Sequence, residues 1–108
     1  MDSETLKKIK RELSDAERRA VERHKYYLSE RAHHDVGFDF ALEDWLQNHS
    51  DHWRSQRLRE DLVRQSEEIR KHKWIESQKA GADLGQKAVE DWIKNYAAKW
   101  RRWREMAE

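Results

Sequence analysis

The chain has 108 residues, the size of one domain, and 42% of them are charged. Only 36% are hydrophobic, so any core must be thin. The lack of cysteine excludes disulfides and thiolate metal sites, and no apolar run approaches the ~20 residues of a membrane span. The N-terminus MDSETLKKIK lacks the apolar core of a signal peptide. We therefore expect a cytoplasmic protein that does not contact a membrane.

The first predicted helix spans residues 3 to 33. Its apolar stripe has the three-and-four spacing of an amphipathic helix and consists of Leu6, Ile9, Leu13, Ala16 and Ala20. Asp2 or Ser3 is placed to cap its start.

Two corners are predicted where the only glycines of this proline-free chain occur, at Gly37, Gly81 and Gly85. Gly81 is placed to end a helix in the left-handed conformation, and His33 takes its place in the first corner. Asp83 is predicted to cap the next helix, with Gln86 completing a capping box. Gly37 and Gly85 are then expected in a first helical turn, where either a close backbone or a bound group would explain them.

The second and third predicted helices span residues 38 to 80 and 84 to 106. A break between Asn48 and Asp51 is the alternative and would give four helices instead of three. Two tryptophans in each half recur at helical spacing and are assigned to the core: Trp45, Trp53, Trp92 and Trp100.

An internal repeat is the strongest signal in the sequence. RHKYYLSERAHHDVG from Arg23 aligns with KHKWIESQKAGADLG from Lys71 through six identities. ALEDWLQNHSDHWRSQR from Ala41 aligns with AVEDWIKNYAAKWRRWR from Ala88 through eight more. We predict one helical domain, 1–108, with repeat 1 at 17–57, repeat 2 at 66–104 and a helical connector at 58–65. The predicted fold is all-α, with two tandem antiparallel helical hairpins from an internal duplication in an elongated bundle of three to four helices.

Antiparallel pairing within each hairpin brings a polar cluster level with an indole, once per repeat. The two clusters are His24, Lys25, Glu43 and Asp44, and His72, Lys73, Glu90 and Asp91. The structural interpretation has imidazole and lysine bound to carboxylates, which sets the register of each hairpin. The functional interpretation makes them two acid–base or ligand sites. We favour the structural one because no nucleophile repeats beside the histidines.

Four further histidines raise a metal hypothesis, with His33 beside His34 and His49 three residues before His52. About 13 residues of helix, or roughly 20 Å, separate His49 from the corner, so the two pairs cannot meet in one hairpin. We therefore predict no metal site and no cofactor.

Basic and aromatic residues gather at the C-terminus and form the candidate binding surface: Lys99, Arg101, Arg102, Trp103 and Arg104. Basic side chains contact phosphates and an exposed indole can stack on a base. Such cations also oppose a helix dipole, which is a common reason to find them there.

Charge is segregated along the chain, since residues 32–53 contain five acidic residues and no lysine or arginine. This favours a protein partner or self-association over a uniform polyanion. We expect a small non-enzymatic helical interaction or regulatory module that forms homo-oligomers. The alternatives are nucleic-acid binding through basic faces and an enzyme or ligand binder using the repeated His/Asp pairs.

Overall fold

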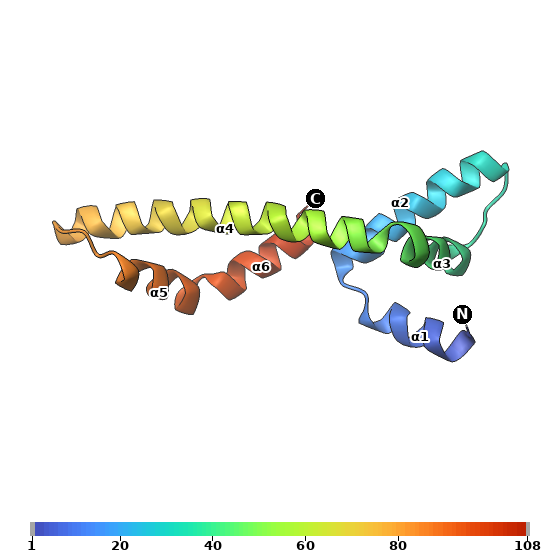
Figure 1. Ribbon diagram of the computed structural model, residues 1–108, viewed down its shortest axis with the longest axis horizontal. Coiled ribbons are helices and arrows are strands. Elements are labelled where there is room, and N and C mark those ends of the chain that lie inside the picture. The colour runs from blue at the N-terminus through green and yellow to red at the C-terminus, as the bar shows by residue number, and fades with distance from the viewer. Residues whose placement is uncertain (1, 108) are drawn as a thin grey trace. The chain divides into compact units, whose positions relative to one another are not determined.

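The computed structural model describes residues 2–107, which form six α-helices and no β-strand (Figure 1). The helices are α1 (Ser3–Glu12), α2 (Asp15–Ala32), α3 (Phe38–Asn48), α4 (Ser50–Ala80), α5 (Gln86–Asn95) and α6 (Ala97–Met106). The all-α prediction is confirmed, but the helices number six instead of three or four. No helix of the described part is both long and apolar enough to cross a membrane. The chain divides into two compact units, residues 1–54 with 105–108 (unit 1) and residues 55–104 (unit 2).

The predicted single helix over residues 3 to 33 is wrong, because α1 ends at Glu12 and α2 begins at Asp15. Leu13 has an extended backbone (φ −61°, ψ 134°), and the Ser14 side chain caps α2 by accepting the Glu17 N–H at 3.1 Å. The sequence Ser14-Asp-Ala-Glu17 carries the pattern of a capping box, which the apolar spacing across it concealed.

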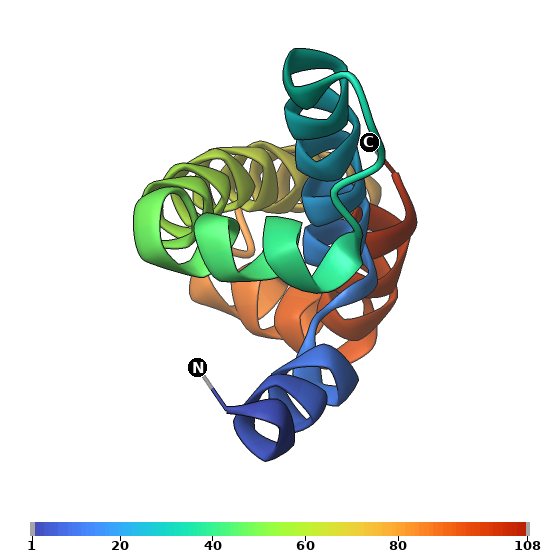
Figure 2. The ribbon, with the colours of Figure 1, turned by 90° about the vertical axis from the view of Figure 1, so that its right-hand side faces the viewer.

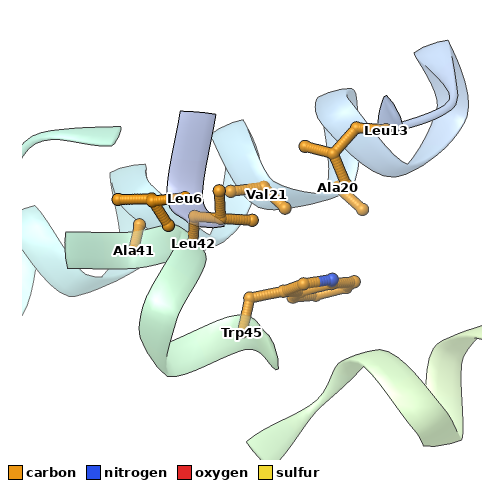
Figure 3. Close-up of a cluster of buried hydrophobic side chains, with 7 residues drawn as sticks. All are labelled: Leu6, Leu13, Ala20, Val21, Ala41, Leu42 and Trp45. Atoms are coloured by element: carbon orange, nitrogen blue, oxygen red, sulfur yellow. The ribbon is translucent and has the colours of Figure 1, made fainter. Parts of the chain in front are cut away.

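Unit 1 has an apolar core shared by α1, α2 and α3, drawn in Figure 3. Its buried members are Leu6, Leu13, Ala20, Val21, Ala41, Leu42 and Trp45. Leu6, Val21 and Leu42 point toward one another, and the Trp45 indole lies below Ala20 in that view. The apolar stripe predicted for the first helix is therefore buried at four of its five positions and partly buried at Ile9, although two helices and the residue between them supply it. An ion pair between Lys10 Nζ and Asp39 Oδ1, 2.7 Å apart, also joins α1 to α3.

The two predicted corners are present, after α2 and after α4 (Figures 1 and 2). His33 ends α2 in the left-handed conformation with φ 61°, and Gly81 follows α4 with φ 68°. In the first corner His34 N–H donates to Ser29 O at 3.2 Å, and in the second Ala82 N–H donates to Ser77 O at 3.2 Å. These are the six-to-one bonds of a Schellman motif.

The helices after each corner begin differently from the prediction. Asp83 does not cap α5: its Oδ1 accepts the Gly85 N–H at 2.9 Å, and Gly85 itself precedes the first helical residue. Gly37 holds the same place before α3, and Asp35 Oδ1 accepts its N–H at 2.9 Å. Both glycines have positive φ, 83° at Gly37 and 55° at Gly85. A Cβ added to either would meet no atom within 4 Å. The positive φ angles therefore explain why glycine occupies both positions, and close packing against another backbone does not.

The predicted uninterrupted helices 38–80 and 84–106 are wrong at one residue each. His49 separates α3 from α4 with φ −132° and ψ −30°, and Tyr96 separates α5 from α6 with φ −124° and ψ −24°. The alternative of a break after Asn48 is therefore the right one.

Each interruption is a kink and not a loop, because backbone hydrogen bonds continue through it. His49 N–H donates to Trp45 O at 2.9 Å, and His49 O accepts from Trp53 N–H at 3.0 Å. Neither proline nor glycine occurs at a kink, so the usual sequence signals are missing. Beyond the first kink, α4 runs without interruption through the predicted connector 58–65.

Unit 2 buries little, although α5 and α6 fold back along α4 (Figure 1). Its buried apolar side chains are Ala88, Trp92 and Ala97, whereas Trp100 is half-buried. In unit 1, Trp45 is buried and Trp53 packs partly buried against the core. The four predicted core tryptophans thus separate into two buried ones and two at the boundary.

Candidate functional site

The first polar cluster lies between α2 and α3. His24 Nε2 and Asp44 Oδ2 are 2.6 Å apart, and because an ionised carboxylate can only accept, the imidazole donates. The His24 side chain is 12% exposed and its ring lies 5.8 Å from the Trp45 ring. The expected meeting of histidine, carboxylate and indole thus occurs here.

His49 joins this pair, which the sequence did not predict. Its Nε2 lies 3.7 Å from Asp44 Oδ2, and its ring is 4.6 Å from that of His24 in an edge-on arrangement. Residues five apart on a regular helix point about 140° away from each other. The non-helical backbone at His49 turns the side chain back toward Asp44. The contact could not be predicted from the sequence, because no proline or glycine marks the kink at His49.

The second polar cluster, between α4 and α5, has the same pair with a different third member. His72 Nε2 lies 2.7 Å from Asp91 Oδ2, and the His72 side chain is also 12% exposed. Tyr96, at the second kink, places its ring 5.1 Å from that of His72. Tyr96 thus stands where His49 stands in the first cluster.

An asparagine orients the carboxylate in each cluster. Asn48 Nδ2 donates to Asp44 Oδ1 at 3.0 Å, and Asn95 Nδ2 donates to Asp91 Oδ1 at 2.7 Å. The hydrogen bond from His24 lowers the pKa of Asp44 below its ordinary value of 3.8. The Asn48 hydrogen bond and coulombic attraction to the two imidazoles act in the same direction, and partial burial opposes them.

Lys73 does not complete the second cluster as expected. Lys73 Nζ lies 3.7 Å from Asp83 Oδ1 at the corner, so it pairs with the loop and not with α5. Glu90 is exposed on α5, while Lys25 and Glu43 are half-buried on α2 and α3.

A buried carboxylate that sequence reasoning missed lies in unit 1. Glu17 is 4% exposed, and its Oε2 accepts the Trp45 indole N–H at 2.9 Å. Arg54 approaches the same carboxylate with Nε at 3.0 Å and Nη2 at 2.9 Å. At the 48-residue offset of the first alignment Glu17 corresponds to Gln65, just before the predicted repeat 2, so comparing the repeats did not reveal this acid.

Four of the five residues of the candidate binding surface at the C-terminus are exposed, and the fifth is buried. Lys99, Arg101 and Arg102 are exposed, and the Trp103 side chain is 54% exposed, with its ring 6.3 Å from that of Trp100. Arg104 is only 5% exposed; its Nε donates to Asp61 at 2.7 Å and its Nη2 lies 3.6 Å from Glu60. Arg104 is therefore a packing residue of unit 2 and not part of the exposed surface.

No family model matches the chain, and neither the curated proteins nor the solved structures include a match.

Proposed function

We propose that the chain is a small non-enzymatic interaction module that associates with a second copy through the outer face of α4. The observation that carries this proposal is the exposure of large apolar side chains there: Leu62 at 55%, Val63 at 59%, Trp74 at 66% and Ile75 at 45%. An apolar patch of this kind on a small charged protein is typical of an interaction site.

Val63 and Trp74 lie within about 20° of each other around the helix and so share one face, while Leu62 and Ile75 flank it on opposite sides, each about 100° away. Two shallow hollows run along it, one bordered by Leu62 and Val63 and the other by Trp74 and Ile75, and both are also lined by Glu67 and Arg70. His72 and Asp61 point away from Val63 and Trp74, because they bind residues of α5 and α6. The outer face has no such partner helix in unit 2, so a second molecule can cover it.

The order of residues on this face suits an antiparallel pair with two-fold symmetry. Two copies of α4 crossing midway between residues 68 and 69 place Val63 opposite Trp74, with Leu62 and Ile75 at the two edges of the contact. The same register places Glu67 opposite Arg70 of the second copy, so both apolar and charged contacts are complementary. This agreement favours a second copy over an unrelated protein.

We also infer that the chain consists of two tandem hairpins from an internal duplication. What supports this is the recurrence of the same contacts in both halves. The His–Asp pair, the Asn–Asp bond and the left-handed corner each occur twice. So does a serine hydroxyl that accepts a loop N–H, Ser29 from Val36 and Ser77 from Leu84, both at 3.1 Å. Copied packing contacts favour a structural role for His24 and His72 over an enzymatic one.

Analytical ultracentrifugation over a range of concentrations tests the proposed pairing. We expect a reversible monomer–dimer equilibrium, which Trp74→Glu weakens by about tenfold or more because it places a charge in the apolar contact. Tyr26→Glu is the matched control, since Tyr26 aligns with Trp74 in the repeat, is 69% exposed and lies in unit 1. A chain that stays monomeric at every concentration contradicts the proposal.

Charge reversal tests the register. Glu67→Arg alone should weaken the dimer, because like charges then face each other across the two-fold axis, and combining it with Arg70→Glu should restore the dimer. If the double variant is no stronger than the single one, the antiparallel register is wrong.

Nucleic-acid binding is the second candidate function, and the exposure of Trp103 beside Arg102 favours it. An indole that is 54% exposed next to cations can stack on an unpaired base. Fluorescence anisotropy with a labelled single-stranded RNA tests this. Salt-sensitive binding that Trp103→Ala abolishes supports it, and binding unaffected by that change counts against it.

A further inference from the structure

We propose that His24, Asp44 and His49 form a binding site for one divalent transition-metal ion per chain, with Zn²⁺ as the best chemical match. Each residue offers one ligand atom, and these atoms all lie within 4.8 Å of one another. Within residues 2–107 this is the one group of three or more such side chains that converges in this way.

The ligand atoms need only small shifts to hold an ion. His24 Nε2 and His49 Nε2 lie 2.6 and 3.7 Å from Asp44 Oδ2. In a tetrahedral zinc site with bonds of about 2.0–2.2 Å, neighbouring ligand atoms are about 3.3 Å apart. The first contact must lengthen and the second shorten, each by less than about 1 Å, and the two imidazole nitrogens, which lie within 4.8 Å of each other, must approach by up to about 1.5 Å. Rotation of the half-exposed His49 side chain supplies this movement.

The residue types match zinc chemistry. Two imidazoles and one carboxylate are a set that proteins use for zinc with an open fourth position, and borderline ions such as Co²⁺ accept the same ligands. The His49 side chain is 48% exposed, so an ion and a water molecule can reach the site from solvent.

The surroundings hold two of the three ligands in place. Asn48 binds the Asp44 Oδ1 atom, which leaves Oδ2 directed at the imidazoles, and His24 packs against Trp45. Outer hydrogen bonds of this kind orient metal ligands. An ion bound to Nε2 takes the place of the proton that His24 donates to Asp44, and the neutral imidazole then carries its ring proton on Nδ1.

The second cluster is a control built into the chain. His72 and Asp91 repeat the pair, but Tyr96 replaces the second imidazole, and a neutral phenol is not among the usual zinc ligands. Unit 2 thus offers two ligands where unit 1 offers three. This difference predicts a stoichiometry of one ion and not two.

Titration of the untagged chain with zinc chloride by isothermal calorimetry, and with Co²⁺ by visible absorption, tests the site. We expect one ion per chain. His49→Tyr, which installs the side chain found in unit 2, should fold normally by circular dichroism and lose at least about tenfold in affinity. Tyr96→His completes the second cluster and should raise the stoichiometry to two.

His52→Gln is the control for adventitious binding, because His52 is exposed and lies outside the cluster; it should leave the affinity unchanged. Absence of binding to the wild-type chain overturns the proposal, and so does affinity that survives His49→Tyr. A stoichiometry that stays at one in Tyr96→His contradicts the geometric argument. None of these outcomes depends on whether α4 mediates dimerisation.

Discussion

The Trp45 indole donates its N–H to the buried Glu17 carboxylate at 2.9 Å, which joins α3 to the first turn of α2. Arg54, from the start of α4, binds the same carboxylate. One side chain thus links three helices of a unit whose apolar core is small. Because a buried N–H that loses its acceptor costs free energy, this contact is a sensitive point of the fold.

We expect Glu17→Ala to lower the free energy of unfolding by about 2–3 kcal/mol, because it leaves the indole N–H and the guanidinium without their acceptor. Glu17→Gln keeps a side-chain oxygen for the indole and should cost only about 1 kcal/mol. Urea denaturation followed by tryptophan fluorescence measures both. Equal losses in the two variants would show that the indole hydrogen bond is not what Glu17 contributes.

The two left-handed corners provide a matched pair of backbone substitutions. His33→Gly should stabilise the protein by about 0.5–1 kcal/mol, because glycine adopts φ 61° without the steric cost that a Cβ imposes. Gly81→Ala should destabilise it by about 1 kcal/mol, and no atom lies near the added Cβ, so the effect is purely one of backbone conformation. Thermal unfolding checks both. A stabilising Gly81→Ala would contradict the assigned backbone conformation.

The corner serines should contribute equally. Ser29→Ala removes the acceptor of the Val36 N–H, and Ser77→Ala removes that of the Leu84 N–H, at a cost of about 1 kcal/mol each. Amide hydrogen exchange by NMR should show faster exchange at Val36 in the first variant and at Leu84 in the second. If exchange at Val36 is unchanged in Ser29→Ala, the hydroxyl does not hold that loop.

Stability should depend on the ionisation of Asp44. Its pKa is lowered in the folded protein, first by the His24 hydrogen bond, so the folded state binds fewer protons than the unfolded state just below pH 4. This contribution is fully present above the ordinary pKa and is lost as the pH falls through the folded value.

Metal-free wild type and Asp44→Asn, unfolded with urea at pH 6 and pH 3, provide the measurement. The stability difference between the two pH values should be smaller in Asp44→Asn, because that variant no longer titrates at this position. An identical pH dependence in the two proteins would show that Asp44 is not the group responsible.

The sequence by itself determined the features that depend on neighbouring residues. The all-α class followed from apolar spacing and the lack of proline. The corners followed from Gly81 and from a histidine that tolerates positive φ in its place. The pairing of His24 with Asp44 followed from the antiparallel geometry of a short corner, because sequence distance from the corner sets the level of each residue.

Only the tertiary structure decided which side chains meet where the chain departs from a regular helix. The kinks at His49 and Tyr96 have no proline or glycine to announce them, and without them His49 would point away from Asp44. The burial of Glu17 and Arg104 likewise depends on helices distant in sequence, which supply the carboxylates and donors that neutralise them. Hydrophobic periodicity reports the average direction of a helix face. It cannot report a one-residue change of direction, and in this protein that change assembles the candidate metal site.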